Sequence, residues 1–362
     1  MPILSRQKLE AYLRRRFGAR VQLVSFGPIG KEISGTSYKQ YGYGAPIRLI
    51  FRVDRQVRQA VLETMSPGPF GHEHPADRAQ AMLWDYDSYG RLPRHVKALD
   101  VGAFREDNSL FSVAEAREFF VLTSWAEGSS YHLDLERLAN GGRMRPLDRQ
   151  RAHRLADYLV QIHNVKHRDH RLYRRRLREL IGHGECIMGL TDSYPDRFGF
   201  ITKELLRSIE DACNRWRWRL RDQGSRLSQV HGDFHPWNVL FRRGADFSVL
   251  DRSRGEWGDP ADDVTSMTIN YLFFSIRRWG VLRGPLENLF QSFWDRYLSR
   301  SKGPDVRETA APFFAFRGLV IASPLWYPTL SLDARRTIFR FVQNVLDSDR
   351  FEPAEIHRYL RD

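Results

Sequence analysis

The chain has 362 residues, of which 42% are hydrophobic and 28% charged, and its net charge is +13. This length and balance are typical of a folded protein with one large or two ordinary domains, and they exclude a disordered or fibrous chain. The two cysteines, Cys186 and Cys213, are too few for a disulfide framework and lack metal-binding spacing. The N-terminal residues become charged at once, and the longest apolar stretch, 313–326, is interrupted by Arg317. We therefore expect neither a signal peptide nor a membrane span, and we predict a cytoplasmic protein.

The positive charge comes mainly from arginine, because only seven of the 57 basic residues are lysine. The arginines are scattered along the chain, with one cluster at 167–180, and no helix-turn-helix, zinc-finger or RNP-type pattern accompanies them. We interpret the cluster as the solvated face of a helix, and we do not expect nucleic acid among the partners.

The first third of the chain is rich in predicted strands. Residues 5–17 fit an amphipathic helix capped by Ser5, and strand-like runs follow from about 21 to 65. A helix is predicted over 76–92, and further strands over 95–104 and 117–128.

The rest of the chain is predominantly helical. An amphipathic helix is predicted over 151–165, and a last helix, capped by Asp333, over 333–349. Between them, the short apolar runs 238–241 and 247–251 are joined by RRGAD, which suits a tight hairpin. The pattern predicts an α+β fold with two lobes and a cleft, a sheet lobe over 1–127 and a larger helical lobe over 128–362.

The stretch HGDFHPWN at 231–238 carries the strongest chemical signal. His231, Asp233 and His235 alternate, which on a strand would place them on one face as zinc ligands, with His72 and His74 as further candidates. This interpretation implies a metal-dependent hydrolase. However, Pro236 favours a loop over a strand, and a zinc cage gives no role to the polar residues that follow.

A phosphotransferase explains more of the same stretch. Phosphoryl transfer needs an acceptor for the substrate's hydroxyl proton and oxygen ligands for the Mg²⁺ that bridges the nucleotide phosphates. Mg²⁺ prefers carboxylate and amide oxygens. Asp233, Asn238 and Asp251 supply that set, and the predicted hairpin would return Asp251 to the side of Asn238.

HGDFHPWNVLF followed by VLDRSRGEWGDPADDV resembles the catalytic and metal-binding segments of the aminoglycoside phosphotransferase and choline kinase family, which has the protein-kinase-like fold. FFVLTSWAEG resembles the hinge between the two lobes of that family. The resemblance implies an antiparallel nucleotide-binding lobe, a helical lobe with the catalytic loop, and Mg²⁺ with ATP or GTP as the phosphoryl donor.

The resemblance also implies roles for individual residues. Asp233 would be the catalytic base, His231 would brace its loop, and Asn238 and Asp251 would hold Mg²⁺. Asp259 and Asp262 would support the loop and the following helix, and the backbone around Ser124 and Ala126 would meet adenine.

One position departs from the family pattern. The family has a lysine on the third strand of the first lobe to bind the phosphates, and Glu63 stands there in this chain. Either the register assigned to this strand is wrong or another cation takes the place of the lysine. Lys31 lies in the predicted glycine loop with Gly27 and Gly30, and Lys39, Arg48 and Arg52 lie on neighbouring predicted strands. The departure leaves open a second hypothesis, a kinase-like interaction module that binds nucleotide poorly.

We predict an enzyme that transfers the γ-phosphoryl group of a nucleotide to a hydroxyl of a small molecule. The acidic and aromatic residues around the motif do not decide between a cationic drug, a quaternary amine and a neutral or anionic metabolite. The choice between ATP and GTP and the oligomeric state also remain open.

Overall fold

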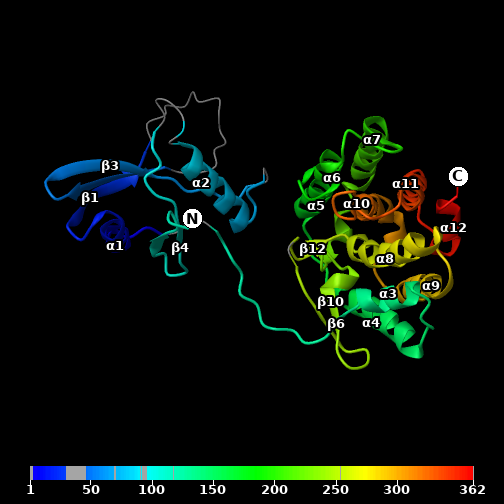
Figure 1. Ribbon diagram of the computed structural model, residues 1–362. Helices are drawn as coiled ribbons and strands as arrows, with labels where there is room; N and C mark the ends of the chain where they lie inside the picture. Colours follow the sequence, from blue (N-terminus) through cyan, green and yellow to red (C-terminus); the bar gives the residue numbers. More distant parts are fainter. Residues whose placement is uncertain are drawn as a thin grey trace. The chain divides into compact units, whose positions relative to one another are not determined.

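The computed structural model describes residues 3–29, 46–68, 71–89, 91, 96–116, 118–252 and 254–361. The chain forms two compact units that divide between Thr123 and Ser124 (Figure 1). We call Met1–Thr123 the sheet unit and Ser124–Asp362 the helical unit, and we describe each by itself. The sequence predicted a division after residue 127.

The sheet unit is built on an antiparallel sheet of three strands in the order β1-β2-β3. Helix α1 packs on β1 and begins at the predicted cap, Ser5, whose side chain accepts a hydrogen bond from the N–H of Lys8. Leu9 and Leu13 of α1 are buried against the apolar side of the sheet, which includes Leu49 and Phe51. The elements of this unit are α1 (Arg6–Phe17), β1 (Val21–Pro28), β2 (Ile47–Val53), β3 (Gln56–Leu62), α2 (Pro75–Tyr89), β4 (Gly102–Phe104) and β5 (Leu110–Ser112).

Two predicted strands differ from the structure, one in its length and one in its existence. Of the strand expected over 95–104, only the last three residues form β4, which pairs with β5. The strand expected over 117–128 is wrong, since the described residues 118–128 form no strand and their apolar side chains are exposed, Phe120 to 92%. Residues with high strand propensity form a strand only where a neighbouring strand supplies hydrogen bonds, and this segment has none.

The helical unit is organised around α8 (Ala261–Trp279), which is buried on nearly all its faces and contacts α9, α10, α11 and α3 (Figure 1). Its buried residues include polar side chains, among them Asp263, Thr268 and Asn270, as well as apolar ones. The other helices are α3 (His132–Ala139), α4 (Pro146–His163), α5 (His170–Gly182), α6 (Ile187–Ser193), α7 (Lys203–Leu220), α9 (Gly284–Arg300), α10 (Ala310–Ala322), α11 (Leu332–Leu346) and α12 (Ile356–Tyr359). The 3-10 turns are η1 (Gly224–Arg226), η2 (Pro236–Asn238), η3 (Val306–Glu308) and η4 (Pro353–Glu355).

The predicted helices of this unit are present. The stripe of α4 is buried as expected at Leu155 and Leu159. The last long helix, α11, is capped by Ser331, whose side chain accepts from the N–H of Ala334, and not by the predicted Asp333, which lies in its first turn.

The predicted hairpin is confirmed. β10 (Val239–Phe241) pairs antiparallel with β11 (Phe247–Val249), and β10 also pairs with β6 (Ser129–Ser130). Gly244 in the connecting turn has φ +76°, a conformation that favours glycine. The remaining strands are β7 (Arg197–Phe198), β8 (Ile201–Thr202), β9 (Ser228–Gln229) and β12 (Trp257–Gly258).

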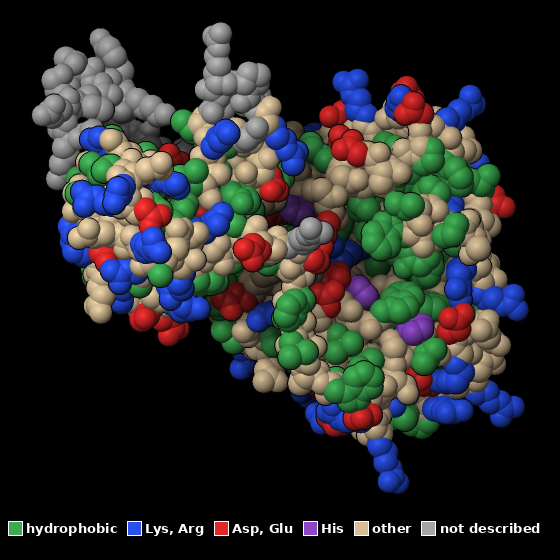
Figure 2. Space-filling view, turned by 60° about the vertical axis from the view of Figure 1, so that its left-hand side comes forward, with side chains coloured by type: hydrophobic (Ala, Val, Ile, Leu, Met, Phe, Trp, Pro, Cys, Tyr) green, Lys and Arg blue, Asp and Glu red, His purple; other side chains and the backbone are tan. Residues whose placement is uncertain are grey.

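The basic side chains do not gather into one patch on the visible face of the helical unit. Figure 2 shows them spread around its rim, with apolar, acidic and histidine side chains in the middle. None of the described helices is long and apolar enough to cross a lipid bilayer.

Candidate active site

Residues 231–238 form a loop that leads from β9 through η2 into β10. Gly232 has φ +85°, and a Cβ atom there would lie 3.2 Å from the Cβ of Arg254. The positive φ favours glycine at this position, and a side chain here would be crowded by Arg254.

The carboxylate of Asp263, in the first turn of α8, holds this loop by its backbone. It accepts hydrogen bonds from the N–H groups of His231 and Gly232, each at 2.7 Å. His163 of α4 lies on the other side, with its Nε2 3.1 Å from the same carboxylate and its Nδ1 2.7 Å from the hydroxyl of Tyr297. The side chain of Asp263 is fully buried. Burial acts to raise the pKa of Asp263, but the hydrogen bond and charge of His163 outweigh it and the pKa is lowered.

Asp233, the predicted base, projects from the loop with its side chain mostly buried. Its Oδ1 accepts a hydrogen bond from Nη1 of Arg317, and its Oδ2 lies 3.4 Å from Nε2 of His235. Burial acts to raise the pKa of Asp233, but the hydrogen bond from His235 and the charge of Arg317 outweigh it, and the pKa lies well below its usual value. At neutral pH Asp233 is therefore a carboxylate that accepts hydrogen bonds only.

Arg317 reaches the loop from α10 and joins it to α8. Its Nη2 donates to the carbonyl oxygen of Gly232 at 2.9 Å and to Oδ1 of Asp262 at 2.7 Å. Its side chain is 7% exposed. The expected support from Asp262 is thus indirect, since Asp262 binds the arginine that binds the loop.

Asn238 ends η2 and is tied to the same loop. Its Nδ2 donates to the carbonyl oxygen of Asp233 at 3.0 Å and lies 3.2 Å from Nε2 of His235. Because the amide nitrogen makes these contacts, the amide oxygen is the atom that Asn238 can offer to a metal ion.

Asp251 follows β11 at the base of the hairpin. The N–H of Leu250 donates to the carbonyl oxygen of Asn238 at 2.9 Å, so Leu250 lies opposite Asn238 and Asp251 is the next residue along the chain. Asp251 has φ +51°, which is uncommon outside glycine, asparagine and aspartate and is frequent at functional sites. A cavity of about 320 Å³ has Asp251, His231 and Tyr158 in its wall.

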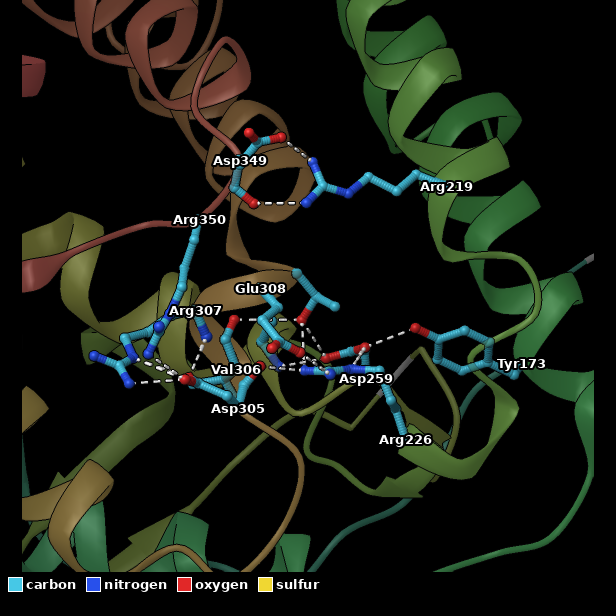
Figure 3. A network of polar contacts seen from close by, with 12 residues as sticks. Tyr173, Arg219, Arg226, Asp259, Asp305, Val306, Arg307, Glu308, Asp349 and Arg350 are labelled. Atoms are coloured by element: carbon cyan, nitrogen blue, oxygen red, sulfur yellow. Dashed lines mark hydrogen bonds and ion pairs between the residues drawn. The ribbon is translucent and has the colours of Figure 1, made fainter.

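Asp259 belongs to a network of hydrogen bonds and ion pairs (Figure 3). Its Oδ2 accepts from the Tyr173 hydroxyl at 2.8 Å and from Nε of Arg226 at 3.1 Å. Its Oδ1 accepts from the Thr309 hydroxyl at 3.1 Å and from the N–H of Ala261, the first residue of α8, at 2.9 Å. Asp259 is thus bonded to the start of the helix that carries Asp262 and Asp263, in line with part of its expected role.

The predicted nucleotide-binding residues belong to other segments of the chain. Gly27 lies in β1 of the sheet unit, Gly30 and Lys31 lie outside the described residues, and Glu63 is exposed directly after β3. Ser124 is exposed and Ala126 half-buried in the segment that leads to β6. Since β6 pairs with β10, the expected hinge continues into the hairpin that carries the candidate metal ligands.

The zinc interpretation finds no support in this geometry. Within the ranges that the structure describes, no group of three or more His, Cys, Asp or Glu side chains is arranged to hold a metal ion. Asn238 and Asp251 carry amide and carboxylate oxygens, the donors that a hard cation prefers.

A family model described as the phosphotransferase enzyme family matches residues 51–307. The chain belongs to this family. It is therefore a small-molecule kinase whose acceptor is a hydroxyl group, and its sheet unit and helical unit confirm the predicted α+β, protein-kinase-like fold. No curated protein sequence matches the chain.

Several solved structures of kinases resemble this phosphotransferase. A spectinomycin phosphotransferase in complex with ADP and spectinomycin is 12% identical, with 99% of each chain covered and a TM-score of 0.34. An amicoumacin kinase is 12% identical over 94% of this chain and 92% of its own, with a TM-score of 0.40. A choline kinase from Streptococcus pneumoniae is 13% identical over 93% and 98%, with a TM-score of 0.36.

Two residues that hold the loop, Asp263 and Arg317, are absent from the roles that the sequence predicts. In the sequence, Asp263 follows the predicted Asp262, and Arg317 interrupts an apolar stretch. That interruption was the signal, because a charged residue inside an otherwise apolar helix is buried only where it has a partner.

Proposed function

We propose that this phosphotransferase transfers the γ-phosphoryl group of ATP or GTP to a hydroxyl of a small molecule, with Asp233 as the base. The observation that supports the proposal is the hairpin bond between Leu250 and Asn238, because Asp251 directly follows the residue bonded to the asparagine that binds the Asp233 backbone. One carboxylate for the proton and two oxygen donors for a cation are thus grouped on one short piece of chain.

The loop residues have separate tasks in this proposal. Asp233 would receive the acceptor's proton. Its low pKa keeps it ionised, so it can accept a hydrogen bond from the hydroxyl and orient it. His231 and Gly232 are held by Asp263, so the base projects from a braced backbone. A fixed position for the reacting group removes much of the entropic cost of the reaction.

The residues present fit a magnesium ion. Asn238 has its amide oxygen available, and Asp251 is exposed, with no hydrogen bond or ion pair to its carboxylate from any described residue. These two side chains would hold Mg²⁺, which when bound neutralises negative charge on the nucleotide phosphates. Backbone near Gly27, Gly30, Ser124 and Ala126, with Lys31 as a cation, is proposed to contact the nucleotide.

A second candidate function rests on Glu63. A carboxylate directly after β3, where the family has a lysine, would repel a triphosphate. On this alternative the chain is a kinase-like interaction module with impaired catalysis. It requires that nucleotide binding be weak or absent.

A panel of hydroxylated small molecules tests the proposed function. The wild-type protein and Asp233→Ala are incubated with Mg²⁺ and ATP or GTP labelled in the γ-phosphoryl group, and labelled product is separated. We expect transfer to one acceptor class, and a loss of about 10²–10⁴-fold in the variant, as is typical when a general base is removed. Equal transfer by both proteins would rule out Asp233 as the base.

A further inference from the structure

We propose that Arg317 is a positioning residue for phosphoryl transfer, which holds Oδ1 of Asp233 and leaves Oδ2 as the oxygen that takes the acceptor's proton. The inference rests on the proposed function, because it assigns a task to one atom of the proposed base. Nothing in the catalytic motif itself fixes that choice, since the two oxygens of a free carboxylate are equivalent.

The contacts of Arg317 give the two oxygens different surroundings. Nη1 of Arg317 binds Oδ1 of Asp233, while Nη2 binds the carbonyl oxygen of Gly232 and Oδ1 of Asp262. The arginine thus binds the side chain of Asp233 and also the backbone carbonyl of the preceding residue in the loop. Asp262 holds the guanidinium from α8 and sets its plane.

The other oxygen faces the residues that we propose for chemistry. Oδ2 of Asp233 lies 3.4 Å from Nε2 of His235 and 3.5 Å from Nδ2 of Asn238. Both contacts are long, and a carboxylate oxygen can accept more than one hydrogen bond, so Oδ2 keeps the capacity to accept from the acceptor's hydroxyl. It also lies on the side of Asn238, where the nucleotide phosphates would be held.

The step that this arrangement favours is balanced in atoms and charge. The acceptor's O–H proton moves to Oδ2 of Asp233, and the acceptor oxygen forms a bond to the γ-phosphorus of ATP. The bond from the γ-phosphorus to the bridging oxygen breaks, and ADP leaves with that electron pair. Oδ1 stays bound to Arg317 throughout, so the carboxylate does not rotate out of line.

Only arginine suits this task. A guanidinium is planar and presents N–H donors in a fixed fork, whereas a lysine ammonium is a point charge on a flexible stem. Three acceptors on two elements, Asp233, Gly232 and Asp262, match the fork. Because the side chain is 7% exposed, water cannot simply replace it.

The test compares Arg317→Ala, Arg317→Lys and a matched control, Arg335→Ala. Arg335 is also a fully buried arginine, but it donates to the carbonyl oxygens of Ala322 and Tyr327 and touches no residue of the loop. The rate measured is phosphoryl transfer from Mg-ATP to the acceptor found in the panel, or to water if none is found. Binding of Mg-ATP is measured separately on each protein, and crystal structures of the wild type and Arg317→Ala give the orientation of Asp233.

We expect Arg317→Ala to lower kcat about 10²-fold, the effect of a small misplacement of a catalytic group, with the KM for ATP changed less than about twofold. Guanidinium ion at millimolar concentration should restore part of the rate, and Arg317→Lys should stay well below wild type. If Arg317→Ala does not fold, Arg317→Lys carries the same expectation of lowered kcat at unchanged KM. In the crystal the Asp233 carboxylate should turn away from its wild-type orientation.

Three results would overturn the inference while leaving the proposed function intact. These are an unchanged kcat in Arg317→Ala, an equal loss in Arg335→Ala, or a crystal structure in which Asp233 keeps its orientation without the arginine. Failure of the proposed function is seen separately, as absence of Mg-ATP binding by the wild type. Even then, the crystal structure of the variant decides whether Arg317 positions Asp233.

Discussion

The carboxylate of Asp263 accepts the backbone N–H of Gly232 at 2.7 Å, across 31 residues of sequence. A charged acceptor in a fully buried position makes a strong hydrogen bond, and the neighbouring N–H of His231 donates to the same group. The loop is thus bound to the first turn of α8, a largely buried helix. This one carboxylate binds two successive backbone N–H groups of the loop.

Replacement of that carboxylate should loosen the loop and the fold. In Asp263→Asn, the amide loses the charge that both N–H groups and His163 bind, and we expect a loss of about 2–4 kcal/mol in the free energy of unfolding. Urea denaturation measures the loss. Asp295→Asn, on the exposed side of α9, is the control that should leave stability unchanged. Equal stability of the two variants would show that the loop does not need Asp263.

The buried pair of Arg226 and Asp259 should be sensitive to removal of one partner. Both side chains are nearly inaccessible, and Arg226→Met would leave Asp259 buried and without its cation. We expect a loss of about 3–5 kcal/mol in the free energy of unfolding, measured by urea denaturation. Arg207→Met, which breaks the exposed pair with Asp211, should cause no measurable change. A similar small effect in both variants would contradict the role of the network in Figure 3.

The two thiols should be unreactive in the folded protein. Burial raises the pKa of Cys186 to about 11, and it raises the pKa of the fully buried Cys213 as well. Because the folded-state pKa is raised, the associated stability is present below the ordinary thiol pKa of about 9 and is lost as the pH rises towards 11. A thiol-specific chromogenic reagent at pH 8 should therefore label neither cysteine in the native protein and both in urea. Rapid labelling of the native protein would show that the helical unit opens at this site.

Glu63 offers a test of the phosphate contact in the sheet unit. If its carboxylate faces the nucleotide, Glu63→Lys should tighten ATP binding severalfold, because repulsion is replaced by attraction. The exposed Glu106→Lys, in the turn between β4 and β5, adds the same net charge elsewhere in the unit. Calorimetric titration with Mg-ATP distinguishes the two. Equal affinities for both variants would place the phosphates away from Glu63.

Local chemistry made part of this structure predictable. Gly244 and the two short apolar runs predicted the hairpin, and with it the return of Asp251 to Asn238, because a hairpin depends on a few adjacent residues. Ser5 predicted the start of α1 for the same reason. At α11 the sequence predicted Asp333 as the cap, but Ser331 is the cap, so the predicted start of the helix is wrong by two residues.

Contacts between distant parts of the chain were not predictable in this way. Arg317 meets Asp233 across 84 residues, and His163 meets Asp263 across 100. No local sequence pattern shows which side chains will meet in this way, because the packing of α4, α8 and α10 determines which of them come together. The exposed segment 118–128 shows the opposite error, in which strand propensity was present but a neighbouring strand was not.

The most direct test of the account is calorimetric titration of ATP into the wild-type protein and into Asp251→Ala, with and without Mg²⁺. The account predicts that the wild type binds ATP only when Mg²⁺ is present, and that the variant loses this binding while keeping its fold. Wild-type protein that binds neither ATP nor GTP with any divalent cation, or an Asp251→Ala variant that binds Mg-ATP as well as the wild type, would contradict it.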